Sequence, residues 1–345
     1  MAADRRDRPP VPAWLGRPLE PVYRAVVARR NRAFDTGRRV FRPPVPVLSV
    51  GNLSVGGTGK TPMVMRLIEV LRAAGHTPMV AMRGYRARPG QPSDEQAEYL
   101  ARFPGLAIVA QPDRAAGILA ALRAAPSSAD CIILDDGFQH RFVARDLDIV
   151  LIDATRSPTT DRCLPAGWLR EPIESLGRAQ VAVLTHAESV GPAALNTLEA
   201  ALLGINPRLV VARASHAWTS LVSDAGALPV SWLSGKRIVV ACGVGHPAPI
   251  FAQARAAGAD VVHECAFPDH HRWAVADLRS LAARQPAADA LLVTAKDWVK
   301  VAPLAGSLAL PWPIVRPVLS LHFDAGEPAL ITRVLEAVTL PPSPR

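Results

Sequence analysis

The sequence predicts an α/β protein with two domains, the first of which is built on a parallel sheet. Three observations predict it. Short apolar runs alternate with helical stretches along most of the chain, which is typical of strand–helix–strand units. One unit contains a glycine-rich loop, and a separate group of strand-like runs follows much later. The length of 345 residues is also sufficient for two domains of ordinary size.

The strand-like runs form two groups. The first comprises 45–50, 79–82, 106–110, 131–134, 148–152 and 181–184, and the second comprises 237–241, 260–263 and 291–294. Residues 214–236 lie between the groups and are predicted to be a linker. We therefore expect a basic N-terminal segment over 1–42, the larger domain over 43–215, and a smaller domain, including the linker, over 216–340.

The composition excludes several classes of protein. With 49% hydrophobic and 20% charged residues, the chain is not expected to be largely disordered. Its four cysteines are far apart and include no CxxC pair, so a disulfide scaffold or zinc ribbon is not expected, and a reducing compartment is. We expect neither a secretory signal nor a membrane-spanning helix, because no uninterrupted apolar run is long enough.

The positive charge lies mainly at the start of the chain. The net charge is +9, and the first 42 residues contain eleven arginines against four acidic residues. The rest of the chain is therefore close to neutral, which argues against a generally basic, nucleic-acid-binding protein.

An amphipathic helix is predicted within this basic segment. Its apolar face has helical spacing, Trp14 stands at its head, and its arginines lie mostly off that face. The face comprises Leu15, Leu19, Val22, Tyr23, Val26 and Val27. Pro18 and Pro21 are expected in its first turn. The helix suits the surface of an anionic membrane, or packs on its own domain; a basic arm on nucleic acid is the least favoured alternative.

A phosphate-binding loop follows the strand 45–50. The loop ends in Gly56-Gly57-Thr58-Gly59-Lys60-Thr61, and helical spacing continues from there to Gly75. Strand, glycine loop and helix together are the context of a P-loop, whose backbone N–H groups converge on phosphate oxygens. We therefore expect a P-loop NTPase-like domain in which Lys60 reaches the β- and γ-phosphates and the Thr61 hydroxyl binds Mg²⁺. The nucleotide-binding residues are expected to be Ser54, Val55, Gly56, Gly57, Thr58, Gly59, Lys60 and Thr61. Ser54 stands where the strict pattern has glycine.

The strand 131–134 ends in Asp135-Asp136, which is the Walker B arrangement of an apolar strand followed by an acid. Asp136 is the first candidate for the metal and Asp135 the second, with the alternative that one of the two caps the following turn. Guanine specificity is not expected, because no NKxD motif follows the strand 181–184.

The segment Asp135-Asp136-Gly137-Phe138-Gln139-His140, together with the loop over 51–62, resembles the tetraacyldisaccharide 4'-kinase family of Gram-negative bacteria. Further matches occur in order over roughly residues 40 to 300. They are Arg83-Gly84-Tyr85, Arg145-Asp146, Leu164–Gly167 with Leu169–Pro172, Cys242–Pro247, Phe267–His271 and Thr294–Asp297.

The resemblance implies an enzyme and its setting. It implies a lipid kinase that transfers the γ-phosphate of ATP to the 4'-hydroxyl of a tetraacyldisaccharide 1-phosphate in lipid A biosynthesis, with ATP and Mg²⁺ as cofactors. It also implies a peripheral protein on the cytoplasmic face of the inner membrane. The partners would be the membrane-embedded acylated disaccharide phosphate and the anionic membrane surface, with no nucleic acid and no obligate protein partner. A membrane-resident substrate favours the membrane-surface interpretation of the N-terminal helix.

The resemblance also implies roles for individual residues. Asp94 and His270 match the proposed catalytic pair, with His271 as the rival of His270. The expected metal site comprises Thr61, Asp135, Asp136 and Glu171, the last acting through water. Candidates for binding the substrate are Arg83, Gln139, His140 and Arg170, since the guanidinium fork suits a phosphate. Ala295 replaces a glutamate of the family pattern, so any role of that side chain is absent or displaced.

Two other functions remain open on the residues alone. One is a P-loop NTPase that acts as a switch on a protein partner, and the other is a non-enzymatic, basic nucleotide-binding module on nucleic acid. The DDGFQH and DHH motifs speak against the first. The confinement of the charge to one amphipathic segment speaks against the second.

Overall fold

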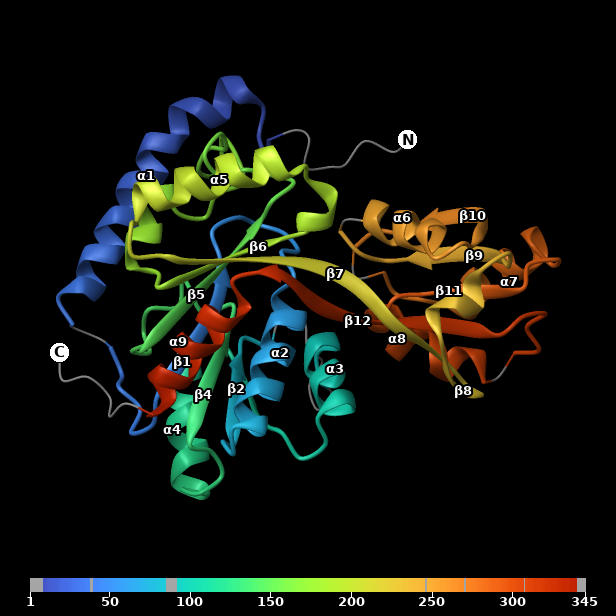
Figure 1. Cartoon of the computed structure of the whole chain (residues 1–345), viewed down its shortest axis with the longest axis horizontal. Helices are drawn as coiled ribbons and strands as arrows, with labels where there is room; N and C mark the ends of the chain where they lie inside the picture. Colours follow the sequence, from blue (N-terminus) through green and yellow to red (C-terminus); the bar gives the residue numbers. More distant parts are fainter. Residues whose placement is uncertain are drawn as a thin grey trace. The chain divides into compact units, whose positions relative to one another are not determined.

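A computed structural model describes residues 9–37, 40–84, 92–245, 247–269, 271–306 and 308–339. The chain forms two compact units (Figure 1). Unit 1 comprises the chain up to His216 and again from Leu321 onward, and unit 2 comprises Ala217–Ser320. Both are α/β, as the sequence predicts.

The helices alternate with strands along the chain. The α-helices are α1 (Ala13–Asp35), α2 (Lys60–Ala73), α3 (Asp94–Arg102), α4 (Arg114–Ala124), α5 (Pro192–Ile205), α6 (Ala248–Ala256), α7 (Val275–Arg284), α8 (Ala295–Ala305) and α9 (Glu327–Thr339). Short 3₁₀ helices in the described part of the chain are η2 (Ile173–Arg178), η3 (Ala187–Ser189) and η4 (Val230–Leu233). The strands are β1 (Val47–Asn52), β2 (Pro78–Met82), β3 (Ala107–Ala110), β4 (Cys131–Asp135), β5 (Leu147–Asp153), β6 (Val181–Thr185), β7 (Val210–Ser223), β8 (Gly226–Leu228), β9 (Arg237–Cys242), β10 (Asp260–Ala266), β11 (Ala290–Leu292) and β12 (Ile314–Ala325).

The sheet of unit 1 places the glycine loop beside the two aspartates. Its strand order is β3-β2-β4-β1-β5-β6-β7, and the neighbouring strands are parallel. Val50 of β1 pairs with Asp135 of β4, so the loop after β1 and the acids after β4 leave the same edge of the sheet. In open parallel sheets, ligands bind at this edge, outside the carboxyl ends of the strands.

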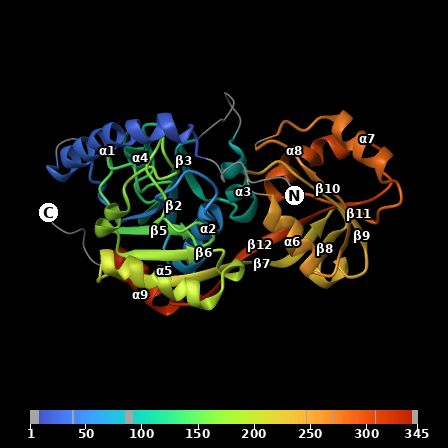
Figure 2. The ribbon, with the colours of Figure 1, turned by 90° about the horizontal axis from the view of Figure 1, so that it is seen from above.

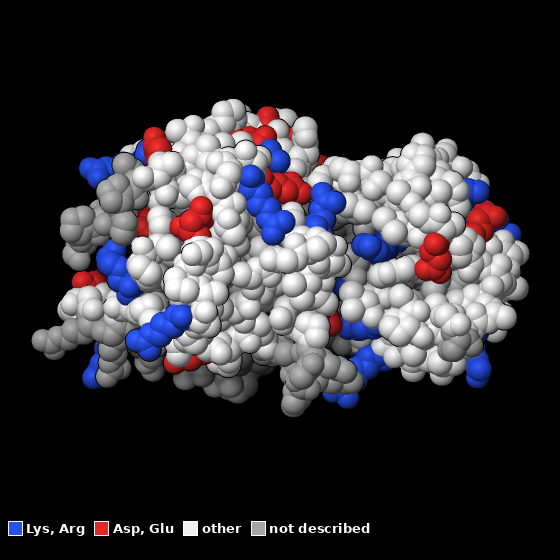
Figure 3. Space-filling view, turned by 90° about the horizontal axis from the view of Figure 1, so that it is seen from below, with Lys and Arg blue, Asp and Glu red and all other residues white. Residues whose placement is uncertain are grey.

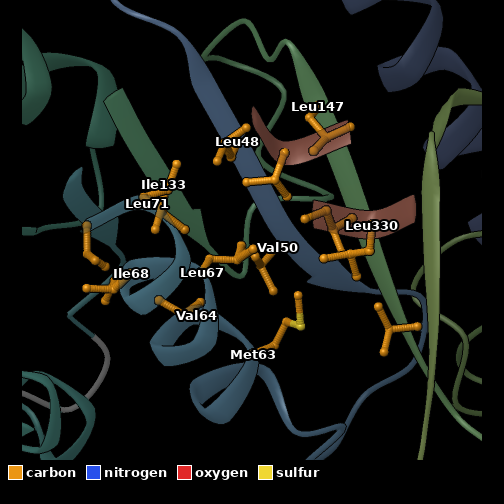
Figure 4. Packing of buried hydrophobic residues seen from close by; sticks show 14 of the residues in the cluster. Leu48, Val50, Met63, Val64, Leu67, Ile68, Leu71, Ile133, Leu147 and Leu330 are labelled. Atoms are coloured by element: carbon orange, nitrogen blue, oxygen red, sulfur yellow. The ribbon is translucent and has the colours of Figure 1, made fainter. Parts of the chain in front are cut away.

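The core of unit 1 lies on both faces of this sheet, because β1, β4 and β5 are buried throughout. On one face, α2, α3 and α9 cover Leu48, Val50 and Ile133, with Leu330 of α9 in the same cluster (Figure 4). On the other face, α4 packs on β1–β4, and α5 with η2 packs on β5 and β6. The three layers hold the loop after β1 between helices on either side.

Unit 2 repeats this design on a smaller scale. Its parallel strands follow the order β10-β9-β11-β12, and β8 pairs antiparallel with β7. Alternate residues of β9 face opposite layers: Ile238 and Val240 pack with α6, and Val239 and Ala241 pack with α7 and α8. Figure 2 shows α6 on the opposite side of these strands from α7 and α8.

The main departure from the sequence prediction lies in how the units are connected. All nine strand-like runs are strands to within a few residues. The predicted linker over 214–236 contains the boundary between the units at His216 and Ala217, but it is not an irregular segment, because β7, β8 and η4 occupy most of it. The chain leaves unit 1 within β7 and returns within β12, so residues 321–339, which were assigned to the smaller domain, group with unit 1.

Helix α1 begins at Ala13, earlier than expected, so Pro18 and Pro21 lie in its interior rather than in its first turn. Each proline removes the hydrogen bond to the carbonyl four residues earlier. Both prolines are exposed, which leaves those carbonyls access to water.

Helix α1 divides its apolar residues between two faces. The outer face comprises Trp14, Leu15, Leu19, Val22 and Val26, whose side chains are 41–77% exposed. Val27 and Phe34 instead are buried against unit 1, and Tyr23 is half-buried. Among the described residues, no helix combines the length and apolar character needed to cross a bilayer. On the face drawn in Figure 3, side chains of both charges are scattered over a largely uncharged surface.

Candidate active site

The phosphate loop of unit 1 has the backbone that its glycines predict. Gly59 adopts φ = +79° as the N-cap of α2, and Gly56 has φ = +124°, both in the region that favours glycine. A Cβ atom on Gly59 would lie 2.6 Å from Nε2 of His216. Lys60 and Thr61 therefore begin α2 with the N-terminal N–H groups of the helix directed at the loop.

The loop has two buried polar atoms without a partner in the described part of the chain, and one of them can donate a hydrogen bond to a phosphate. Oδ1 of Asn52 and Oγ1 of Thr58 are buried without a hydrogen-bond partner among the described residues. Around Gly57, no atom lies within 4 Å of where a Cβ would be, so this side of the loop is open. Buried polar atoms are normally satisfied, and the Thr58 hydroxyl can donate to a phosphate oxygen, whereas Oδ1 of Asn52 can only accept a hydrogen bond. The N–H groups at the start of α2 are further donors of the kind that phosphate groups need.

Asp136 contacts both the lysine of the phosphate loop and Arg170. Its Oδ1 lies 3.6 Å from Nζ of Lys60, and Nη1 of Arg170 donates to both of its oxygens at 2.9 and 3.1 Å. Burial opposes ionisation of Asp136, but Lys60, Arg170 and Arg114 outweigh it and lower the pKa of the carboxyl to about 2. Its φ of +52° is unusual for a residue other than glycine.

Asp135 occupies a different environment from its neighbour. It is buried, and the hydroxyl of Tyr99 in α3 donates to its Oδ2 at 2.9 Å. Burial and the charge of Glu95 raise the pKa of Asp135 to about 6. Both Tyr99 and Glu95 belong to α3, whose first residue is Asp94, so the predicted catalytic aspartate starts a helix that is tied to β4.

A pocket of about 620 Å³ opens beside Asp136. It brings together the four predicted substrate-binding residues, Arg83, Gln139, His140 and Arg170. Its other lining residues are Phe41, Pro112, Asp113, Arg114, Ala115, Asp136 and Phe142. The pocket therefore combines arginines with aromatic and aliphatic side chains, and one wall of it is the acid that contacts Lys60.

Arg114 is a pocket residue that the sequence analysis missed. It is 3% exposed, its Nη1 donates to the carbonyl of Asp136 at 3.0 Å, and its Nε has no partner among the described residues. Burial lowers the pKa of its guanidinium. No motif marked Arg114. The available signal was its position shortly after the predicted strand 106–110, because parallel strands end at the same edge of a sheet.

Glu171 makes its contacts away from the phosphate loop. It is fully buried; Oε1 accepts from Arg30, and Oε2 accepts from Asn31 of α1 and pairs with Arg178 at 2.9 Å. These contacts bind α1 to η2 across about 140 positions of sequence, which local motifs do not reveal. The participation of Glu171 in metal binding stays a prediction.

In unit 2, His270 lies outside the described residues. His271, the alternative candidate for its catalytic role, makes contacts within unit 2. Nε2 of His271 lies 3.0 Å from Oδ2 of Asp277, and its ring stacks on Phe267 with centroids 4.2 Å apart. These contacts fix both the ring and one of its nitrogens, so the half-buried neighbour of His270 is anchored to Phe267 and to Asp277 of α7.

Asp297 connects two of the sequence motifs of unit 2 with Trp273, which lies two residues after a third motif. This fully buried carboxylate accepts from the backbone N–H of Gly243, from Nε1 of Trp273 and from Oγ1 of Thr294, at 2.9, 2.9 and 2.7 Å. The motifs at 242–247, 267–271 and 294–297 thus meet at or beside one side chain. Ala295, which replaces a glutamate of the family pattern, begins α8 next to it.

Comparison with known proteins identifies the family. The model of the family described as tetraacyldisaccharide-1-P 4'-kinase matches residues 12–339. The chain belongs to this family. A tetraacyldisaccharide 4'-kinase of Bordetella parapertussis is 39% identical over 311 residues, covering 84% of this chain and 85% of that protein. One of Anaeromyxobacter dehalogenans is 36% identical over 332 residues, covering 88% and 86%.

The fold agrees with this family. A solved structure of the kinase LpxK from Aquifex aeolicus, in complex with ATP, superimposes with a TM-score of 0.69 and 28% sequence identity. The match covers 93% of this chain and 98% of the other. Family members are phosphotransferases of lipid A biosynthesis, and the phosphate loop and adjoining pocket of this 4'-kinase have the two parts that a phosphoryl transfer requires.

Proposed function

We propose that the chain transfers the γ-phosphate of ATP to the 4'-hydroxyl of a tetraacyldisaccharide 1-phosphate. The observation that carries this proposal is the position of Asp136. It lies 3.6 Å from the lysine of the phosphate loop and also lines the 620 Å³ pocket, so donor and acceptor would meet at one carboxylate. The family comparison does not favour the alternative of a nucleotide-driven switch on a protein partner.

ATP is the nucleotide that we propose for the loop, supported by the ATP complex of the LpxK relative. Lys60 would hold the β- and γ-phosphates, and the N–H groups of residues 54–61 would surround them. Thr61, Asp136 and Asp135 are the residues that would hold Mg²⁺, in that order of preference. When bound, Mg²⁺ neutralises charge that develops on the transferred phosphoryl group.

The acceptor hydroxyl must lose a proton, and we propose that Asp94 and His270 serve this step. A sugar hydroxyl ionises far above neutral pH, so a positioned base is required. Asp94 would accept the proton or orient the imidazole of His270. The anchoring of α3 to β4 through Tyr99 and Asp135 supports a defined position for Asp94.

The acceptor is proposed to bind in the pocket through its charge and its hydroxyl groups. Arg83, Arg114 and Arg170 supply cations for the phosphate already present on the disaccharide. Gln139 and His140 can hydrogen-bond hydroxyl or amide groups. Phe41 and Phe142 offer apolar surface in the same pocket, and Phe142 is 46% exposed.

The lipid substrate also requires contact with a membrane, and we propose that the outer face of α1 provides it. Trp14, Leu19 and Val22 are exposed on a helix that also carries several arginines. Such a helix binds in the plane of an anionic bilayer. The protein would act as a peripheral protein on the cytoplasmic face of the inner membrane, where ATP and the acylated disaccharide meet.

The test is transfer of labelled phosphate from ATP to purified tetraacyldisaccharide 1-phosphate in the presence of Mg²⁺. Wild-type protein should phosphorylate the lipid, and Lys60→Ala should reduce the rate by at least about a hundredfold, because charge stabilisation of the phosphoryl group is lost. Asp94→Ala and His270→Ala should each lower kcat by a larger factor than that by which they change the KM for ATP. Lys236→Ala is the matched control, since this lysine packs on Trp232 in unit 2. A wild-type protein that transfers no phosphate would refute the proposal.

A further inference from the structure

A segment over 162–171, here called the bridging segment, pairs with the start of the phosphate loop. The backbone N–H of Val55 donates to the carbonyl of Trp168 at 2.8 Å, and that of Arg170 donates to the carbonyl of Leu53 at 2.7 Å. Ser54 and Leu169 form a β-bridge between these two bonds. The position of this part of the loop therefore depends on the position of the bridging segment.

Helix α1 holds the same segment through its inner face. Gly16 packs so closely that a Cβ would lie 3.0 Å from Cα of Ala166. Glu20, which is 7% exposed, accepts from the backbone N–H of Cys163 at 3.1 Å and from Arg162 at 2.9 Å.

Farther along α1, two more contacts reach the end of the bridging segment. The hydroxyl of Tyr23 donates to the carbonyl of Arg170 at 2.8 Å, and Arg30 and Asn31 bind the carboxylate of Glu171.

The backbone carbonyl, the backbone N–H and the side chain of Arg170 each make a hydrogen bond. Its carbonyl accepts from Tyr23, its N–H donates to the loop residue Leu53, and its side chain donates to Asp136 and, at 3.4 Å, to Gln139. Of these contacts, only the one from Tyr23 comes from α1. Among the described contacts between α1 and the bridging segment, it is the one made to a residue that lines the pocket.

The outer and inner faces of α1 are separate. The exposed apolar residues Leu15, Leu19, Val22 and Val26 each precede, by one position, a residue that faces unit 1: Gly16, Glu20, Tyr23 and Val27. Neighbouring residues on a helix point about 100° apart. The same four turns are therefore exposed to solvent on one side and face the bridging segment on the other.

We propose that Tyr23 is a positioning residue for Arg170, and that α1 thereby supports the active centre in addition to meeting the membrane. The proposal rests on the proposed kinase function. Removal of the Tyr23 hydroxyl leaves the Arg170 carbonyl without this donor, so Arg170 and the start of the phosphate loop are held less firmly. The outer face of α1 is unaltered by this change.

The experiment compares full-length wild type, Tyr23→Phe and Thr332→Val, a matched hydroxyl deletion on the surface of α9. Four quantities are measured: kcat and KM with detergent-dispersed lipid, the Kd of MgATP, sedimentation with phosphatidylethanolamine–phosphatidylglycerol vesicles, and Tm. Tyr23→Phe should lower kcat about fivefold and weaken ATP binding about threefold, the scale of one hydrogen bond. Its KM for the lipid, vesicle binding and Tm should stay near those of wild type, as should all values of Thr332→Val.

The outcomes separate the two proposals. A kcat and Kd of Tyr23→Phe equal to those of wild type would overturn the positioning role, as would a loss of kcat that follows vesicle binding or Tm. A wild type that binds ATP but phosphorylates no lipid would refute the kinase function. In that case the Kd of MgATP for Tyr23→Phe still decides whether α1 supports the phosphate loop.

Discussion

Asp135 and Asp136 are adjacent in the chain but lie in opposite electrostatic environments. Asp135 ends a buried strand beneath Tyr99, where burial and Glu95 raise its pKa to about 6. Asp136 turns out of the strand with φ = +52°, toward Lys60 and Arg170, and its pKa falls to about 2. A change of backbone direction at one residue thus separates a carboxylate aimed at the phosphate loop from one held by α3.

The first prediction concerns the close approach of Gly51 and Phe138. A Cβ on Gly51 would lie 2.5 Å from Cβ of Phe138, which is fully buried. Gly51→Ala should therefore lower the free energy of unfolding by about 2 kcal/mol through overpacking, measured by urea denaturation.

Gly204→Ala is the control for this prediction. This glycine lies in α5, and apart from its chain neighbours and the backbone of its own helix no atom is within 4 Å of the added Cβ. The substitution should leave stability equal or slightly higher, because alanine favours the helix. Equal losses for both variants would contradict the steric explanation.

The second prediction concerns His216, which packs against Gly59 of the phosphate loop. Burial and the neighbouring His186 lower the pKa of His216 to about 4, although Asp153 acts in the other direction. Its ring stacks on His186 at 4.5 Å, and Glu188 accepts from its backbone N–H. Because the folded-state pKa lies below the unfolded value of about 6.5, the unfolded chain takes up the proton first.

The contribution of His216 to stability is therefore complete above pH 6.5 and is lost as the pH falls toward 4. When the pH falls from 8 to 5, protonation of His216 in the unfolded chain should lower the free energy of unfolding by about 2 kcal/mol. His216→Phe keeps an aromatic ring there and should remove this part of the loss in urea titrations at the two pH values. His263→Phe, in β10, should lose as much as wild type; an unchanged loss in His216→Phe would refute the assignment.

At the scale of the element, α1 combines two surfaces that its sequence pattern did not separate. The spacing of apolar residues predicted one face from Leu15 to Val27, but Val27 and Tyr23 turn toward unit 1 while Leu19 and Val22 remain exposed. Apolar periodicity marks a broad stripe, and only the docking partner decides which part of it is covered. The contacts with the bridging segment come from residues far away in the sequence and leave no local signal.

The third prediction tests the outer face of α1. Leu19 and Val22 are 44% and 62% exposed, and replacing both with serine removes apolar area that would enter the bilayer. The double variant should bind anionic vesicles at least about tenfold more weakly in a sedimentation assay. Val299→Ser with Leu319→Ser, two exposed apolar residues of unit 2, should bind as wild type does. Equal weakening by both pairs would contradict a specific role for α1.

The strands were predictable from the sequence to a greater extent than their connections. Runs such as 131–134 and 181–184 are buried on both faces, so they are continuously apolar and easily recognised. In β7 and β12, buried residues are interspersed with partly exposed ones, and the pattern predicted neither strand. The phosphate loop and most pocket residues lie in recognisable motifs, whereas Arg114, Tyr23 and Asp297 act through contacts that only the fold creates.

At the scale of the molecule, unit 1 is built from both ends of the chain. Helix α9 packs in the same core cluster as β1 and α2, and Arg66 of α2 binds Glu327 at the start of α9 at 2.7 Å. The strand and helix on either side of the phosphate loop thus depend on residues beyond position 320. Unit 2 is accordingly an insertion between two parts of unit 1, rather than a domain that follows it.

The fourth prediction follows from this arrangement. Leu330 of α9 is 1% exposed, and Leu330→Ala should lower the free energy of unfolding of unit 1 by about 3 kcal/mol. Leu319→Ala, at a site that is 39% exposed, should cost less than about 1 kcal/mol. The measurement is denaturant unfolding followed by loss of ATP binding. Equal costs would show that α9 does not contribute to the stability of the nucleotide-binding unit.

The return of the chain to unit 1 also sets an order of events during synthesis. The phosphate loop leaves the ribosome early, but α9, which covers the sheet beneath it, is translated only after the whole of unit 2. Until α9 has been made, the apolar face formed by β1 and α2 remains exposed, and a chaperone would bind it. A message that ends before α9 would yield a polypeptide with every residue of the phosphate loop and no stable place for ATP.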